Sequence, residues 1–334
     1  MNRLRPCLLA ALAATLALDA AAQEKIQYKV TFALNWIPSG NHFGVFTAKD
    51  RDLYRDANVD VDIQRGYGSG DTLKRVATGN GDIGIADAAS VIIGRSKGMK
   101  VRQIASVFDT PFDCIFFLEG NGIAKPKDLE GRTLGATPGE TTVNILPIFA
   151  ANAGIDAKKI SILNLSPSAK YASLAAKTVD AIVGSTVEEP AIQNAAQKTG
   201  SNVKRFRFSD YGVDYYSIGL IAGDDMLATR GDLVRRLVGA TMQGYAWSIQ
   251  HPEEAADAFA RSVPESSRDL MLAQWKIAVG HMVTERTRKN GLGWIEPARM
   301  AATLRLTKTY QDIDPAIRAE DLYSMDYLAK IPLN

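Results

Sequence analysis

The 334-residue chain has little of several residue types on which common functions depend. Three histidines and two cysteines leave little material for a zinc or other soft-metal site. The formal net charge is only +2, so no basic field points to a nucleic-acid partner. Hydrophobic residues make up 46% and charged residues 23% of the chain, which is typical of a globular protein with a substantial core.

The motifs of several enzyme classes are also missing. The sequence has no Gly-x-Ser-x-Gly, no His-Glu-x-x-His and no P-loop. The glycine-rich stretch 66–70 lacks the spacing of a dinucleotide site, so we expect no cofactor. His42 is the one histidine that falls in a candidate site, and we expect binding rather than catalysis.

Long apolar runs are absent except near the start of the chain. Arg3 and Arg5 precede the apolar run Cys7–Leu18, and small residues follow it as far as Ala22. This pattern predicts a secretory signal over residues 1–22, cleavage after Ala22 and a periplasmic protein. The mature chain would then keep only Cys114, which we expect to be buried in a strand, so its stability must come from the core.

Strand and helix patterns alternate through most of the chain. The pattern predicts an α/β fold with mostly parallel sheets and helices on both faces. Length suggests about two domains. The expected strands cover residues 27–34, 59–65, 82–86, 101–107, 115–118, 133–136, 160–164, 181–184, 203–208 and 216–222. The expected helices cover residues 44–54, 72–78, 88–97, 141–153, 169–176, 190–199 and 231–250, followed by a largely helical tail.

The pattern restarts after Asp109-Thr110-Pro111, which indicates two lobes joined near Phe108. We expect lobe 1 to comprise residues 23–109 and 216–334, and lobe 2 to comprise residues 110–215. The strand at 216–222 would return the chain to lobe 1.

Four polar junctions lie between an expected strand and the start of a helix. Ligands of open α/β sheets bind beyond the carboxyl ends of the strands, and a helix start offers unpaired N–H groups there. The alternative is that the polar side chains only cap their helices. The candidates from these junctions are Asn35, Trp36, His42, Ser69, Asp87, Gly139, Glu140 and Thr141.

Two further features allow both a structural and a functional interpretation. Trp36 ends a strand beside Pro38, where it could be a core residue or the flat wall of a cleft. Glu188 and Glu189 precede Pro190, and they could be surface charge or could accept a hydrogen bond from a ligand amino group. Phe108 and Tyr215 lie near the two crossings between lobes and are candidate aromatic walls.

Several segments together resemble a known family. The chain is similar to the periplasmic solute-binding proteins of ABC importers, in the group that contains the alkanesulfonate binders and the thiamine-pyrimidine (NMT1/THI5-like) proteins. Asn-Trp-x-Pro followed by His resembles the branch that binds pyrimidine precursors of thiamine. The matching segments are ALNWIPSGNHFGVFTAKDRDLY, VDVDIQRGYGSGDTLKRVATGNGDIGIADAASVI, KPKDLEGRTLGATPGE, VDAIVGSTVEEPAI, GLGWIEPARMAATL and DLYSMDYL.

The resemblance implies a two-lobed periplasmic-binding-protein fold, type II-like, with mixed sheets and a hinge. It implies a monomer that holds a heterocyclic solute in the cleft and delivers it to an inner-membrane permease with a cytoplasmic ATPase. Trp36 would stack on the ring, and Glu189 resembles the acceptor for an amino group. No nucleic acid or cofactor is implied.

The sequence departs from this branch at two places. Residues 43–46 differ from the sequence usual in this branch at that position. Residues 185–187 lack the aromatic residue often found before the glutamate that corresponds to Glu189. A riboflavin or another aromatic or sulfonate solute is therefore an alternative ligand. A pyrimidine synthase on the same fold and a sensor subunit are alternative functions, although the cysteine-rich motif of the synthases is absent. Which of Glu188 and Glu189 faces the cleft is left open.

Overall fold

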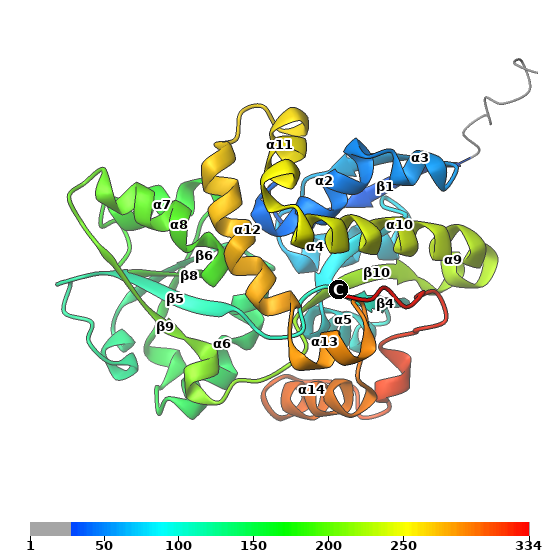
Figure 1. Cartoon of the computed structure of the whole chain (residues 1–334). Helices are drawn as coiled ribbons and strands as arrows, with labels where there is room; N and C mark the ends of the chain where they lie inside the picture. The colour runs from blue at the N-terminus through cyan, green and yellow to red at the C-terminus, as the bar shows by residue number, and fades with distance from the viewer. Residues whose placement is uncertain (1–27, 334) are drawn as a thin grey trace, which may run out of the picture.

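The computed structural model describes residues 28–333, in which two five-stranded sheets are flanked by helices (Figure 1). The strand orders are β2-β1-β3-β10-β4 and β7-β6-β8-β5-β9, and we call the part of the chain built on each sheet lobe 1 and lobe 2. This architecture confirms the predicted α/β fold class. The proposed signal sequence at 1–22 lies outside the described residues.

The strands of lobe 1 are β1 (Tyr28–Ala33), β2 (Val59–Gln64), β3 (Ile83–Asp87), β4 (Val101–Ser106) and β10 (Ile218–Gly223). Those of lobe 2 are β5 (Asp113–Leu118), β6 (Thr133–Ala136), β7 (Ser161–Asn164), β8 (Ala181–Ser185) and β9 (Val203–Arg207). The expected lobe boundaries fall in the connections between the two sheets. That the lobes move as separate bodies stays a prediction.

Helices cover both faces of each sheet. The larger helices of lobe 1 are α2 (Phe43–Asp50), α4 (Ser69–Ala77), α5 (Ala88–Ser96), α10 (Gly231–Gln250), α11 (Pro252–Ser262), α12 (Arg268–Met282) and α14 (Pro297–Tyr310), and the shorter ones are α3 (Leu53–Asp56), α9 (Asp224–Thr229) and α13 (Glu285–Asn290). Lobe 2 has α6 (Thr141–Asn152), α7 (Pro167–Ala175) and α8 (Glu189–Gln197).

Local sequence explains where several helices begin and end. The expected helix at 44–54 is divided into α2 and α3 because Asp52 adopts a left-handed conformation, with φ of 59°. Pro167 occupies the first turn of α7, a position that suits its fixed φ and missing N–H.

The sheets are mixed because one strand in each runs against its neighbours. β10 is antiparallel to β3 and β4, and β5 is antiparallel to β8 and β9. Each of these two strands is the first after a crossing between lobes, so the chain enters the new sheet from the edge that faces the other lobe. The start of β10 therefore lies beside the carboxyl end of β3, and the start of β5 lies beside the carboxyl end of β8.

Helix α12 connects the lobes in another way. It packs on the short helix η2 (Gly40–His42) of lobe 1 and on η5 (Thr186–Glu188) and α8 of lobe 2. In Figure 1 it runs between lobe 2, at the left, and the rest of lobe 1. Its His281 ring lies 3.0 Å from the Thr110 hydroxyl in the first crossing and 2.9 Å from the Thr186 hydroxyl in lobe 2.

Candidate functional site

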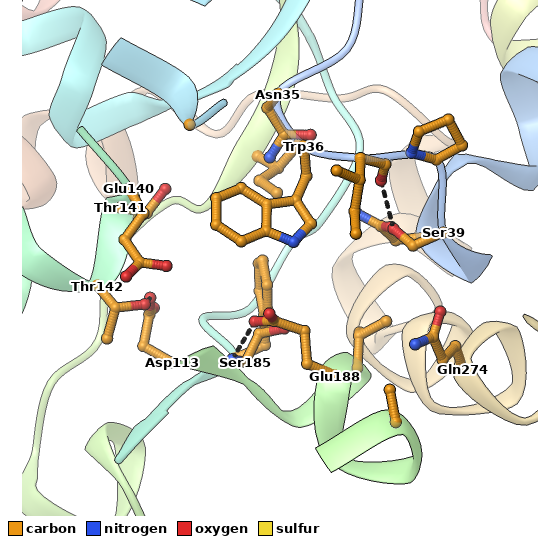
Figure 2. A pocket seen from close by; sticks show the side chains of 18 of the residues that line it. Asn35, Trp36, Ser39, Asp113, Glu140, Thr141, Thr142, Ser185, Glu188 and Gln274 are labelled. Atoms are coloured by element: carbon orange, nitrogen blue, oxygen red, sulfur yellow. Dashed lines mark hydrogen bonds between the residues drawn. The ribbon is translucent and has the colours of Figure 1, made fainter. Parts of the chain in front are cut away.

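A cavity of about 260 Å³ lies between the lobes, and side chains from both of them line it (Figure 2). Lobe 1 contributes the loop after β1, the start of α4, the start of β10 and one side of α12. Lobe 2 contributes the starts of β5 and α6, the end of β8, α7 and η5. The lining residues that carry the argument below are Asn35, Trp36, Ser69, Asp113, Glu140, Thr141, Thr142, Tyr171, Ser185, Glu188 and Gln274.

The loop after β1 is held from behind by His42, which is fully buried. The Ser39 backbone N–H donates to His42 Nδ1 over 3.3 Å, so the ring proton lies on Nε2 and is donated to Asn35 Oδ1 over 3.0 Å. Burial lowers the pKa of His42 to about 3, so the ring is neutral. His42 therefore fixes the conformation of the loop and does not itself line the cavity.

Trp36 stands in the middle of the cavity wall in Figure 2. Its side chain is only 9% exposed, yet its buried Nε1–H meets no hydrogen-bond acceptor at bonding geometry in the described part of the chain. The Lys170 ammonium lies 4.8 Å from the ring centre. This wall thus presents a flat ring, and its N–H donor lies near the Tyr171 hydroxyl without a hydrogen bond of standard geometry.

Lys170 is fully buried in α7, and it joins two carboxylates of the cavity wall. Its Nζ lies 2.7 Å from Glu140 Oε2 and 3.6 Å from Glu188 Oε1. Burial alone would lower the pKa of Lys170, but the two glutamates raise it above its ordinary value, so the side chain stays charged.

Hydrogen bonds fix the geometry of both glutamates. Glu140 accepts from the Thr137 backbone N–H over 2.7 Å, and Glu188 accepts from the Ser185 N–H over 2.8 Å and from the Tyr171 hydroxyl over 2.5 Å. Burial raises the pKa of Glu140 to about 7, although Lys170 acts in the opposite direction. The wall thus carries two rigid carboxylates that share a single cation.

A third carboxylate, Asp113, begins β5 at the cavity. It accepts from the Thr142 hydroxyl over 2.8 Å and from the Tyr215 hydroxyl. Burial raises the pKa of Asp113 to about 6.

The two lobes touch directly beside the cavity. The Thr141 hydroxyl of lobe 2 donates to Asp87 Oδ2 of lobe 1 over 2.8 Å, and the Gly70 N–H donates to the Gly139 carbonyl over 3.1 Å. Gly68 has φ of +122°, and a Cβ there would lie 2.7 Å from the Gly139 oxygen. A side chain at Gly68 would therefore be strained and would push the lobes apart.

The structure places the predicted site residues in three groups. Asn35, Trp36, Ser69, Glu140 and Thr141 line the cavity. His42, Asp87 and Tyr215 lie directly behind the wall and bond to residues that line it, and Gly139 forms the contact between lobes.

Two predicted residues lie elsewhere. Phe108 packs edge-on against Phe112, with the ring centres 4.9 Å apart, in the crossing between lobes. Glu189 pairs with Arg205 and borders a separate hollow, which shares only Phe112 and Asp113 with the cavity among the described residues. Glu188 is the member of the glutamate pair that lines the cavity.

Sequence reasoning missed several residues of the wall. Asp113 begins β5 with no motif around it, and Lys170 and Tyr171 lie inside the short helix α7, also with no motif around them. The residues that α12 contributes are Leu270, Met271 and Gln274. The one signal for Lys170-Tyr171 was a lysine within an otherwise small and apolar helix, PSAKYASLA, which does not by itself point to burial.

The family follows from comparison of the sequence with known families. The family model described as NMT1/THI5 like matches residues 39–255, which is more than half of the chain. The chain belongs to the NMT1/THI5-like family. Within the described residues, no group of three or more His, Cys, Asp or Glu could hold a metal ion, and no helix is long and apolar enough to cross a membrane.

Three relatives show the range of named proteins to which this family member is similar. A formylaminopyrimidine-binding protein of Halalkalibacterium halodurans is 24% identical over 310 residues, or 92% of both chains. The riboflavin-binding protein RibY of Chloroflexus aurantiacus is 26% identical, covering 82% of this chain and 78% of its own. A 4-amino-5-hydroxymethyl-2-methylpyrimidine phosphate synthase of Candida albicans is 23% identical, covering 72% of this chain and 74% of its own.

Solved structures support the fold. The ligand-binding component of an ABC-type import system from Staphylococcus aureus matches with a TM-score of 0.69 at 15% identity, covering 90% of this chain and 98% of its own. The alkanesulfonate-binding protein SsuA from Xanthomonas axonopodis pv. citri, bound to MOPS, matches with a TM-score of 0.67 at 15% identity. The match covers 89% of this chain and 98% of the SsuA chain. The two-lobed architecture is thus that of the periplasmic binding proteins.

Proposed function

We propose that this protein is the periplasmic substrate-binding component of an ABC importer, and that it captures a small planar amino-heterocycle. The ligand class is the thiamine-related pyrimidines, such as hydroxymethyl- or formylamino-pyrimidine. One observation carries the proposal. A cavity lined by both lobes presents the indole of Trp36 together with the fixed carboxylate of Glu188.

These groups match the chemistry of an aminopyrimidine. The ring would stack on the indole, the Trp36 N–H would meet a ring nitrogen or an exocyclic oxygen, and Glu188 would accept from the amino group. Desolvated stacking with one or two hydrogen bonds would give roughly micromolar affinity, about 8 kcal/mol.

The size of the cavity favours a single ring. Its volume of about 260 Å³ lies slightly below the range of about 300–1,000 Å³ usual for ligand pockets. A tricyclic flavin would need the lobes to move apart, which would break the contact between Asp87 and Thr141.

The transport mechanism would be closure of the lobes around the solute. Because the wall has contributions from both lobes, a ligand that touches both stabilises the closed form over the open one. We propose that the inner-membrane permease recognises this closed form.

The position of His42 supports a binding role over synthesis. A histidine consumed or used in catalysis must reach the ligand, whereas both ring nitrogens of His42 are engaged with the loop behind the wall. Because some relatives are named synthases, the binding experiment should also test whether the bound pyrimidine is chemically converted.

Calorimetric titration with formylamino- and hydroxymethyl-pyrimidine tests the proposal, with riboflavin as comparison. We expect micromolar binding of at least one pyrimidine, no binding of riboflavin, and release of the pyrimidine unchanged on denaturation, as read by mass spectrometry. Absence of heat and of thermal stabilisation with both pyrimidines would contradict the assignment, and recovery of a converted product would favour an enzyme.

A further inference from the structure

The charged groups around the cavity do not balance. Among the described residues, those that line the cavity or bond through their side chains to residues lining it include four carboxylates, Asp87, Asp113, Glu140 and Glu188, and one cation, Lys170. Lys170 is fully buried and already contacts two of the carboxylates, so it has no free face for an anionic ligand.

Asp87 lies where the starts of three helices converge behind the cavity wall. Helices α4, α5 and α6 all begin at this point, and helix starts are favourable positions for anions. Asp87 Oδ1 accepts from the Ser90 N–H over 2.8 Å, and Asp87 Oδ2 accepts from the Ser90 and Thr141 hydroxyls over 2.6 and 2.8 Å. The Ser90 N–H at the start of α5 and the Thr141 hydroxyl at the start of α6 are thus used by a carboxylate of the chain itself, which is 0% exposed.

Trp36 supplies an independent indication of the ligand. Its buried N–H forms no hydrogen bond of standard geometry among the described residues, although it lies near the Tyr171 hydroxyl, and the Lys170 ammonium already lies 4.8 Å from the ring centre. A ligand that fits this wall has a flat ring with an acceptor atom for the N–H.

We propose that the cavity binds its ligand as a cation, an amino-substituted heterocycle protonated on a ring nitrogen, and that Asp87 is a specificity-determining residue that excludes oxyanions. This inference rests on the proposed function and names the charge of the ligand. The SsuA structure was solved bound to MOPS, a sulfonate, so a sulfonate is the appropriate anionic probe for this fold.

Binding would then move protons, and the direction depends on pH. Burial raises the pKa of Glu140 to about 7 and that of Asp113 to about 6, and the neighbouring carboxylates Glu188 and Asp87 add to these shifts. At a pH below these pKa values, Glu140 and Asp113 are protonated in the empty site. A cationic ligand lowers the pKa of both carboxyl groups, so they release their protons to the buffer. At a pH above these pKa values, Glu140 and Asp113 are ionised. A ligand that is neutral in solution then takes up a proton from the buffer on its ring nitrogen when it binds.

The tyrosines, cysteine, lysine and histidines near these carboxylates keep their protonation states over this range. Burial raises the pKa of Tyr171, Tyr215 and Cys114 well above neutrality, and Lys170 stays charged. Burial lowers the pKa of His42 to about 3 and that of His281, beside Phe112, to about 4. The proton exchange therefore reports on Glu140 and Asp113 and on the ligand.

The test is calorimetry with three probes in pairs of buffers that differ in ionisation enthalpy. The probes are 4-amino-5-hydroxymethyl-2-methylpyrimidine, its 4-oxo analogue and ethanesulfonate. We expect the amino compound to bind at least about tenfold more tightly than the oxo analogue, with no binding of ethanesulfonate. We also expect the amino compound to release protons near pH 5.5 and to take them up near pH 8.5.

Two matched variants test the role of Asp87. Asp87→Asn keeps a good helix cap but removes the charge, and it should reduce the preference for the amino over the oxo compound by about tenfold. Asp82→Asn is the control, because Asp82 lies just before β3, at its opposite end, and bonds to the Thr31 N–H. The preference should not change in Asp82→Asn.

The outcomes separate the two proposals. If neither pyrimidine binds, the proposed function fails. If both pyrimidines bind equally without proton exchange, or if ethanesulfonate binds the wild-type protein, the cation inference is overturned while the binding function stands. An unchanged preference in Asp87→Asn overturns the role of Asp87.

Discussion

Lys170→Met is the substitution that tests the buried charge network most severely. Methionine keeps the length and apolar stem of the side chain but removes the charge that Glu140 and Glu188 share. Removal of one partner of a buried ion pair leaves the other uncompensated, and this typically costs about 3–5 kcal/mol of unfolding free energy. Because Lys170 is fully buried, we expect a loss of this size.

The loss should depend on pH with a definite sign. The pKa of Glu140 is raised in the folded protein to about 7, above its ordinary value of 4.5, so its contribution to stability is fully present below the ordinary value and is lost as pH rises through about 7. Removal of Lys170 raises this pKa further. The variant should therefore be most destabilised above neutral pH and should recover stability as pH falls toward 5.

Urea unfolding followed by tryptophan fluorescence at several pH values measures these effects. The double variant Lys170→Met/Glu140→Gln should recover about 2 kcal/mol or more of the loss, because it removes one of the orphaned charges. Lys127→Met is the control, since Lys127 pairs with Glu130 but its side chain is 54% exposed. A Lys170→Met protein as stable as the control, or a double variant no better than the single one, would refute the reasoning.

Three further predictions concern the site. Trp36→Ala should weaken pyrimidine binding by about 1–3 kcal/mol in calorimetry, and no change would mean that the indole is only a core residue. Glu188→Gln should weaken binding of the amino compound more than of its oxo analogue, whereas Glu189→Gln should leave both affinities unchanged, because Glu189 pairs with Arg205 outside the cavity; the reverse result would place the acceptor at Glu189. Because burial lowers the pKa of His42 to about 3, the unfolded chain takes up a proton more readily, so stability should fall as pH drops from about 6.5 toward 3. In His42→Gln this fall should be smaller, and an unchanged acid-unfolding profile would contradict the neutral buried ring.

The sequence predicted most strands and helices because their hydrophobic residues recur with a clear period. The alternating VDVDIQ of β2 and the apolar β5 were found, and Cys114 is buried in β5 as expected. The direction of β5 and β10 was not predictable from local pattern, because it depends on where the chain crosses between lobes. Pattern likewise cannot show that Asp52 adopts a left-handed conformation and divides a helix.

The sequence prediction covered the part of the cavity wall at junctions between strands and helices, and it missed the residues inside helices and at the start of β5. Asn35, Trp36, Ser69, Glu140 and Thr141 lie at junctions that a sheet rule identifies. Lys170 and Tyr171 lie within a helix whose buried face depends on tertiary packing. Glu188 ends the turn η5 and borders the cavity, whereas Glu189 begins α8 and borders the separate hollow, a difference that local pattern cannot show.

The most direct test of the account is a crystal structure with 4-amino-5-hydroxymethyl-2-methylpyrimidine soaked into the wild-type protein. We predict ligand density between the lobes, with the ring parallel to the Trp36 indole at van der Waals distance and the amino group within hydrogen-bond reach of Glu188. Density in any other hollow, or a ring in this cavity that contacts neither Trp36 nor Glu188, would contradict it.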